Sequence, residues 1–242
     1  MSLIIHHVKT VPEGDDVEVK RLFPIQNFMN FDPFVLWDHF EIGAGRGFPD
    51  HPHRGFEGIT YMLDGGMNHK DNLGNNAFVS AGGLQRFTAG RGIIHSEMPA
   101  DTGISSGIQL WINLPQRLKK IAPDYQQLNN NDIPYQNIDG GKIKNLVGGD
   151  SSLNLQTDVI YQHLYLNQQA KHTLFVKEGM RGIIYMLTGS ISVNKTLIKI
   201  GQALLIEDVT QLDFSALENS QFLICFGMPH HEPIHQHGPF VD

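Results

Sequence analysis

Two short segments of the chain carry residue types that bind metal ions. His51 and His53 belong to a His-Pro-His segment, and His95 and Glu97 belong to a His-Ser-Glu segment. Residues i and i+2 of a β-strand point to the same face, about 7 Å apart. Two such strands facing each other would present three imidazoles and one carboxylate to a common point. Three nitrogen donors and one oxygen donor suit a divalent first-row metal ion, so we predict a metal site formed by these four residues.

The surroundings of the two segments favour this interpretation over surface histidines at a strand edge. Glycines precede both segments and allow the backbone to turn sharply near strand ends. A metal-binding imidazole usually donates its second nitrogen to an oxygen, and Glu57, Asp50 and Glu41 are the candidate acceptors. A His-x-His pair alone would be equally compatible with surface histidines and with a metal site. The glycine-flanked His-x-Glu pair about 40 residues later favours the metal site.

The residue types leave the identity of the metal open. Only one cysteine is present, so a structural zinc finger is excluded. Three histidines and one glutamate could hold Fe, Mn, Co, Ni, Cu or Zn. An octahedral ion with four protein ligands keeps two adjacent positions, which suits a substrate and O₂ bound side by side.

The elements that must position these residues are β-strands. Short runs rich in Val, Ile, Tyr, Phe and Leu are separated by Gly, Asn and Asp turns, which indicates an all-β sandwich or barrel. The clearest runs are residues 34–37, 58–63, 108–114, 182–187 and 221–226. Residues 115–121 are the best candidate for a short helix.

The chain also contains an internal repeat. Gly58–Gly65 and Gly182–Gly189 match at six of eight positions with an offset of 124 residues, close to half of the 242 residues. We therefore expect two copies of one β-domain, residues 1–127 and 128–242, with residues 125–139 as the connector and the C-terminal tail packing across the domains. The offset places Phe175, Lys177 and Arg181 at the positions of His51, His53 and Glu57, so the second copy lacks the ligands.

Composition narrows the remaining classes of function. The formal charge of −7 offers no basic surface for nucleic acid or an anionic membrane. No run approaches the roughly 18 apolar residues of a membrane helix, and the N-terminus does not read as a signal peptide. Cys225 lies in an apolar run and is interpreted as a small buried hydrophobe. We expect a cytoplasmic monomer.

The chain resembles the cupin superfamily and, within it, the pirin family. The spacing of Gly45, His51, His53 and Glu57 approximates the first cupin motif, although the closing Gly65 falls one residue late. The likeness to pirins is closer and extends over the whole chain. It rests on the segments Phe31–Phe40, Gly47–Glu57, Thr88–Pro99, Gly107–Pro115 and His237–Val241.

This resemblance implies two tandem cupin barrels, a bicupin, with metal in the N-terminal barrel only. It implies an Fe(II)-type ion held by His51, His53, His95 and Glu97, with Glu57 outside the ligand set. Some pirins act as quercetin dioxygenases, so the leading expectation is a flavonol (quercetin-type) 2,4-dioxygenase that cleaves the ring with O₂ and releases CO. In that reaction Glu97 or Glu57 would take the proton of the substrate's 3-hydroxyl group. An enzyme for another small enolic compound is a further alternative.

A second hypothesis belongs to a different class: a non-enzymatic, iron-dependent regulatory or redox-sensing protein that acts through a protein partner. The depth of the pocket at the metal discriminates the two, since a deep apolar cavity favours the enzyme.

Several other residues have two readings. A C-terminal histidine cluster could be a second metal site, but is better explained as a solvated segment (His230, His231, His235 and His237). His39 and His69 are assigned to loops or strand ends. Most of the phenylalanines that precede the His-Pro-His segment are assigned to the core, with one or two at the pocket mouth. Arg54 either orients an anionic substrate or forms a surface salt bridge.

Overall fold

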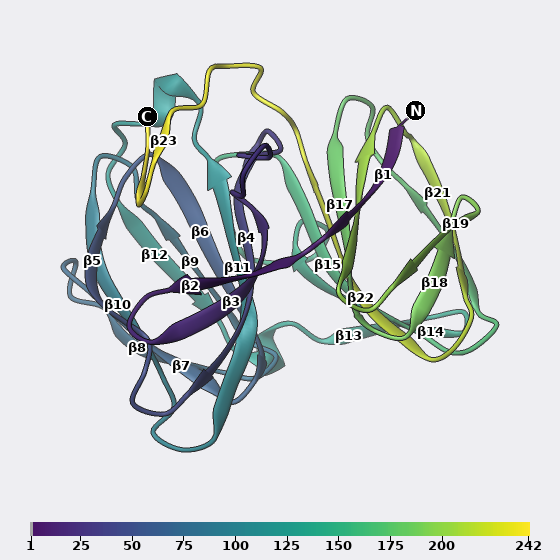
Figure 1. Ribbon diagram of the computed structural model, residues 1–242, viewed down its shortest axis with the longest axis horizontal. Coiled ribbons are helices and arrows are strands. Elements are labelled where there is room, and N and C mark those ends of the chain that lie inside the picture. The colour runs from purple at the N-terminus through teal and green to yellow at the C-terminus, as the bar shows by residue number, and fades with distance from the viewer. Residues whose placement is uncertain (1) are drawn as a thin grey trace. The chain divides into compact units, whose positions relative to one another are not determined.

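The computed structural model describes residues 2–242, and these are built from antiparallel β-strands (Figure 1). Within this range the helices are the 3₁₀ turns η1 (Gln116–Leu118) and η2 (Asn130–Asp132). The all-β prediction is confirmed, and the helix expected over residues 115–121 is reduced to one turn. Neither of these short turns could cross a membrane, and no longer helix occurs in the described residues.

The chain divides into two compact units. Unit N comprises Lys9–Asp132 and His230–Asp242, and unit C comprises the residues up to Val8 and Ile133–Pro229. The division near residue 130 is close to the expected boundary, but the N-terminal residues belong to unit C; residues 230–242, the tail expected to pack across the domains, belong to unit N. Residues 125–139 are also more than a connector, because they include two strands that pair with their own units.

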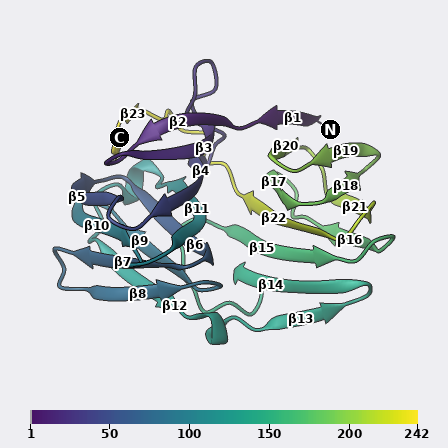
Figure 2. The same ribbon diagram turned by 60° about the horizontal axis from the view of Figure 1, so that its bottom comes forward.

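Unit N consists of a seven-stranded sheet and a four-stranded sheet (Figure 2). The strands of the larger sheet, in spatial order, are β12 (Asp124–Leu128), β9 (Leu84–Thr88), β6 (Phe56–Asp64), β11 (Ile104–Asn113), β4 (Phe34–Gly43), β3 (Val17–Phe23) and β2 (Lys9–Glu13). Those of the smaller sheet are β5 (Phe48–His53), β10 (Ile93–Pro99), β7 (Gly66–Asp71) and β8 (Asn76–Ser80). The short strands β23 (Gln236–His237) and β24 (Phe240–Val241) form a hairpin in the C-terminal segment of this unit.

Unit C repeats this topology. Its larger sheet has the order β1 (Ser2–His7), β20 (Gln202–Glu207), β17 (Arg181–Thr188), β22 (Ser220–Gly227), β15 (Val159–Leu166), β14 (Gly141–Val147) and β13 (Tyr135–Ile138). Its smaller sheet has the order β16 (Lys171–Phe175), β21 (Gln211–Ala216), β18 (Ser190–Val193) and β19 (Thr196–Lys199). Strand for strand, β1 takes the place in unit C that β12 takes in unit N, which is why the N-terminal residues belong to unit C.

The alternation of side chains along the strands explains how the site is positioned. In β10, Ile93, His95 and Glu97 are buried, and Ile94 between them is exposed. One face of β10 therefore carries both candidate ligands together with an apolar residue of the core. That core includes Phe56, Phe87 and Trp111 from the larger sheet, and aromatic side chains thus surround the ligand-bearing strand.

The repeated glycine at the start of the matching segments has a packing role. A Cβ atom on Gly182 would lie 2.0 Å from the Phe226 ring, which is fully buried in the core of unit C. We predict that Gly182→Ala destabilises the protein by about 1–3 kcal/mol through overpacking. Gly43→Ala is the matched control, since a Cβ there meets nothing within 4 Å. Chemical unfolding of both variants measures the difference, and equal midpoints would contradict this packing.

Candidate metal centre

Three histidines of unit N come together where β5 and β10 lie side by side. The register pairs His95 with His51 across the two strands. The ring centroids of His51, His53 and His95 are 4.5–4.9 Å apart, and their potential ligand atoms all lie within 4.8 Å of one another. The predicted convergence of the imidazoles is therefore present, but the two strands are neighbours in one sheet rather than opposite each other.

The positions of the nitrogens fit a shared metal ion. The Nε2 atoms of His95 and His51 lie 3.1 Å apart. Two nitrogens bound at about 2.1 Å to one ion, at a right angle, are separated by about 3.0 Å. The imidazole donor set suits the borderline divalent metals rather than Mg²⁺ or Ca²⁺. The histidine cluster can therefore hold such an ion.

Backbone carbonyls orient two of the three rings. His51 Nδ1 lies 2.7 Å from the Pro49 carbonyl oxygen, and His53 Nδ1 lies 3.2 Å from that of Pro239. Because a carbonyl can only accept, each Nδ1 must carry the proton, which leaves the Nε2 lone pair for a metal.

The carboxylates expected to orient the rings have other described contacts or lie at the surface. Glu41 forms an exposed ion pair with Lys20 at 2.7 Å, and Asp50 is exposed at the cavity rim. Glu57 is buried and accepts a hydrogen bond of 2.8 Å from the Thr88 hydroxyl.

Burial keeps the histidines in the form that binds metal. Burial, together with the neighbouring His51, lowers the pKa of His53 to about 3. Burial and the surrounding histidines hold the pKa of His95 well below its ordinary value. Both rings are therefore neutral at physiological pH, so metal binding need not displace a proton from them.

Glu97 lies in the cavity next to the histidines, but outside the group of three. A bulge between His95 and Glu97 shifts the register, so Glu97 pairs with Phe48. Its Oε1 atom accepts from the Gln85 amide and from the Thr60 hydroxyl, which lies 2.6 Å away. Its Oε2 atom receives only a long bond of 3.3 Å from the Gln109 amide. Oε2 is thus the oxygen with capacity for a further partner.

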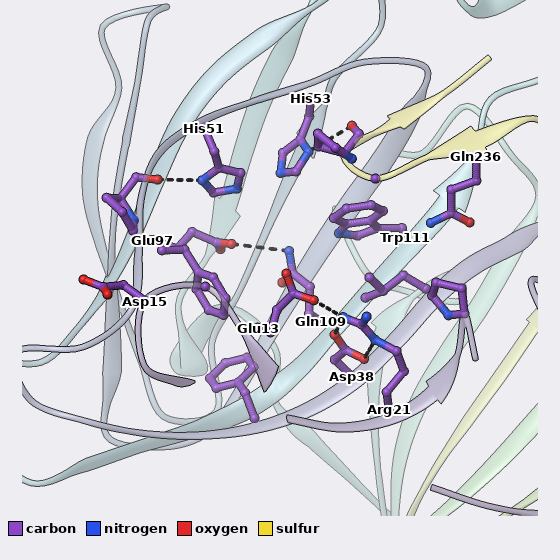
Figure 3. A pocket seen from close by; sticks show the side chains of 18 of the residues that line it. Glu13, Asp15, Arg21, Asp38, His51, His53, Glu97, Gln109, Trp111 and Gln236 are labelled. Carbon is purple, nitrogen blue, oxygen red and sulfur yellow. Dashed lines mark hydrogen bonds and ion pairs between the residues drawn. The ribbon is translucent and has the colours of Figure 1, made fainter. Parts of the chain in front are cut away.

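A cavity of about 680 Å³ opens on His51, His53 and Glu97 (Figure 3). Its lining includes Phe48 and Trp111, whose ring centroids lie 6.5 Å from that of His51 and 4.9 Å from that of His53, together with Phe40 and Met67. Among the phenylalanines that precede the His-Pro-His segment, Phe40 and Phe48 line the pocket. Phe31 and Phe34 are core residues.

A charged cluster forms the wall away from the histidines. Arg21 donates to Asp38 through Nε at 2.8 Å and through Nη2 at 2.6 Å, and its Nη2 also contacts Glu13 (Figure 3). Burial alone would lower the pKa of Arg21, but the two carboxylates more than offset it and raise that pKa. The lining contains five carboxylate side chains and this single guanidinium, so the cavity is acidic overall (Glu13, Asp15, Asp38, Asp50, Glu97 and Arg21).

The C-terminal strap, residues 235–242, closes one side of the cavity with Gln236, Gly238 and Pro239. Arg54 fastens it by two bonds to the Asp242 carboxylate, at 2.8 and 2.7 Å, and by stacking its guanidinium over the Phe240 ring. Arg54 therefore forms a surface salt bridge rather than a contact with substrate. The histidines of the C-terminal cluster form no group of potential ligands within residues 2–242.

Two histidines were misassigned from sequence. His39 lies in the middle of β4, and His69 lies within β7 and is fully buried. The His69 ring is 5.3 Å from that of His95. The available signal was the His-x-Asp spacing of His69 and Asp71, which repeats the spacing of the two ligand pairs.

The corresponding strands of unit C carry other residue types. In β16 and β21, Phe175 pairs with Gln211 in the way that His51 pairs with His95. Gln211 therefore stands at the position of His95, and Phe175 is 74% exposed. In the described part of the chain, the histidine group occurs in unit N alone.

Comparisons with known proteins match both parts of the chain to one family. Residues 16–112 match the pirin family model, and residues 161–242 match the pirin C-terminal cupin domain. The chain is 38% identical to mouse pirin over 240 residues, covering 95% of this chain and 83% of mouse pirin. It is 34% identical over 257 residues to a putative quercetin 2,3-dioxygenase of Pseudomonas aeruginosa, covering 99% and 90% of the two chains.

Solved structures show the same fold. A quercetin 2,3-dioxygenase from Acinetobacter baumannii superposes with a TM-score of 0.90 at 29% identity, covering 98% of this chain and 90% of that one. A bacterial pirin from Escherichia coli in complex with nickel(II) gives a TM-score of 0.79 at 25% identity, covering 94% and 99%. These likenesses confirm the two-cupin architecture.

The lowered pKa of His53 makes the stability of the metal-free protein depend on pH. As pH falls, the unfolded chain protonates this histidine near pH 6.5, and the folded protein does so only near pH 3. The unfolded state therefore binds more protons than the folded state between pH 6.5 and about pH 3. The contribution of neutral His53 to the free energy of unfolding is fully present above pH 6.5. It decreases by up to about 1.4 kcal/mol per pH unit as pH falls through this range. We predict that His53→Gln reduces this slope in urea unfolding of metal-free protein at pH 4–7. An unchanged slope would contradict the assignment.

The strap should also control metal affinity. A Cβ on Gly55 would lie 1.7 Å from the Val241 carbonyl oxygen, so Gly55→Ala must displace the strap and, with it, the Pro239 carbonyl. We predict several-fold weaker Ni²⁺ binding, measured by calorimetry. Gly45→Ala is the matched control, because Gly45 has nearly the same φ (+82° against +85°) but open space around it. Equal losses in both variants would point to backbone strain instead.

Proposed function

The chain belongs to the pirin family, and from that premise we propose that it is a metal-dependent dioxygenase of the quercetin (flavonol) type. The observation that carries the proposal is the cavity, which opens directly on the two histidines of β5 and on Glu97. A metal ion sealed behind side chains would favour the non-enzymatic alternative, a regulatory or redox-sensing protein. Access for a small molecule supports the enzyme.

We assign the metal-binding role to His51, His53 and His95, with Glu97 Oε2 as the fourth ligand atom. Fe²⁺ is the proposed ion, and the nickel(II) complex of the Escherichia coli pirin supports the ability of this fold to hold a divalent metal. When bound, such an ion supplies Lewis acidity that stabilises the deprotonated form of an enolic hydroxyl group.

Glu97 is the residue best placed to receive the proton of that hydroxyl group. Its Oε1 atom is held by Gln85 and Thr60, so the carboxylate plane is fixed. Its Oε2 atom would accept the proton after leaving the metal, with the Gln109 amide as its remaining contact. Glu57, the other candidate, does not line the cavity and is bonded to Thr88. We therefore assign the general base to Glu97.

The walls of the cavity favour a neutral aromatic substrate with several hydroxyl groups. Phe40, Phe48 and Trp111 offer apolar surfaces for a planar ring system. At the far wall, the carboxylates of Asp38 and Glu13 can accept hydrogen bonds from hydroxyl groups, and Arg21 holds them in place. The excess of carboxylates disfavours anionic substrates. A polyhydroxylated flavonol meets these requirements, as do smaller neutral enols.

The direct test is aerobic turnover of quercetin by iron-loaded protein. We expect consumption of O₂, release of CO and a ring-opened product, each measured against protein stripped of metal. A panel of neutral and carboxylated enolic compounds, run under the same conditions, tests the preference for neutral substrates. Stoichiometrically bound iron with no turnover of any member would overturn the dioxygenase proposal and favour the regulatory alternative.

The assignment of the base is tested by Glu97→Gln. The amide keeps the size of the side chain but cannot take a proton, so kcat should fall by about 10²–10⁴-fold. Glu57→Gln provides the comparison, and we expect a smaller effect from it. A larger loss of kcat in Glu57→Gln, with metal content unchanged in both variants, would transfer the role to Glu57.

A further inference from the structure

We propose that His69, held by Asp71, is a positioning residue for His95, and that its Nδ1 atom accepts a hydrogen bond from the His95 Nδ1–H group when a metal ion is bound. This inference rests on the metal site of the proposed function, but not on the reaction catalysed there. With His69 as acceptor, each of the three histidines would have a partner for its Nδ1 atom. His51 and His53 already have such partners in the structure, and His95 does not.

His69 is oriented firmly by its neighbours in β7 and β12. Its Nε2 lies 3.0 Å from Asp71 Oδ2, and both side chains are fully buried. Asp71 is itself fixed, since its carboxylate accepts from the backbone N–H groups of Leu73 and Asn75 and from the Asn75 amide. The His69 ring also stacks on Tyr125, with centroids 4.3 Å apart and planes at 21°.

These contacts determine which nitrogen of His69 carries the proton. The Asp71 carboxylate is surrounded by donors and acts only as an acceptor, so the proton of His69 resides on Nε2. Nδ1 is then a bare lone pair. This atom is buried and has no hydrogen-bond partner among the described residues. An unsatisfied buried acceptor costs about 1–3 kcal/mol, and a nearby donor would remove that cost.

His95 is that donor. Its Nε2 atom lies 3.1 Å from His51 Nε2, on the side where the ligand atoms converge, so a bound ion occupies the Nε2 lone pair and the proton must reside on Nδ1. His95 Nδ1 is also buried without a partner in residues 2–242. The ring centroids of His69 and His95 are 5.3 Å apart and their planes are inclined at 59°, a separation that a direct hydrogen bond between the two Nδ1 atoms or one bridging water molecule can span.

The result is a chain of complementary donors and acceptors from Asp71 through His69 to His95. Metal ligands are commonly supported in this way, and loss of the support typically weakens metal binding about 10–100-fold. Here the support for the third ligand comes from side chains, whereas backbone carbonyls support the other two. His69 and Asp71 therefore contribute to metal affinity without contacting the ion or the substrate.

Ni²⁺ affinity of the full chain, measured by calorimetry, tests the proposal without requiring any turnover. We expect His69→Phe, which keeps the stacking on Tyr125 but removes the acceptor, to weaken binding about 10–100-fold. His69→Gln, whose carbonyl can still accept, should recover part of this loss. His39→Phe is the matched control, since His39 lies in the same unit but not at the cavity, and it should bind Ni²⁺ normally.

Asp71→Asn separates positioning from packing. The new amide presents N–H donors to His69 Nε2, so the His69 proton moves to Nδ1. The Nδ1–H groups of His69 and His95 then face each other, and neither can accept a hydrogen bond. We expect a loss of Ni²⁺ affinity comparable to that of His69→Phe in protein that remains folded. In the Zn²⁺ complex, an exchange-protected His95 Nδ1–H proton resonance should be present in the unsubstituted protein and absent in His69→Phe. Normal Ni²⁺ affinity in folded His69→Phe and Asp71→Asn would overturn the proposal.

Discussion

The structure of the candidate site depends on what binds the Nδ1 atoms of its histidines. An imidazole can direct Nε2 at a metal only if Nδ1 holds the proton, and a buried N–H group needs an acceptor. Pro49 and Pro239 provide carbonyl oxygens for His51 and His53. These two acceptors lie 190 residues apart in the sequence, so the ligand geometry depends on the folding of the whole of unit N. The aromatic packing around β10 and the fastening of the strap both serve this geometry.

The sequence predicted the convergence of the three histidines better than it predicted their hydrogen-bond partners. His51, His53 and His95 were identified from spacing alone, because a period of two on a strand is a local property. Glu97 was expected on the same face, and it is there, but a bulge separates it from the histidine group. Bulges depend on pairing with a distant strand and leave no local signal in His-Ser-Glu.

The supporting residues could not be predicted for the same reason. Carboxylates near the histidines in sequence, such as Glu41 and Asp50, were natural candidates, but the acceptors are backbone carbonyls, which every residue has. His69 was assigned to a loop or strand end because a single histidine carries little information. The first residues lie in unit C rather than in the N-terminal domain expected from sequence, since pairing of β1 with β20 joins residues about 200 apart.

The position of the strap in the sequence has a consequence for the order of assembly. Unit N includes β5 and β10, which leave the ribosome early, but the Pro239 carbonyl that orients His53 is synthesised after all of unit C. Domains generally fold as they emerge, first those nearest the N-terminus. This unit cannot follow that order completely, because the Pro239 carbonyl that orients His53 belongs to residues translated after unit C. Until residues 230–242 have been synthesised, the Nδ1–H group of His53 therefore lacks the acceptor that fixes its ring.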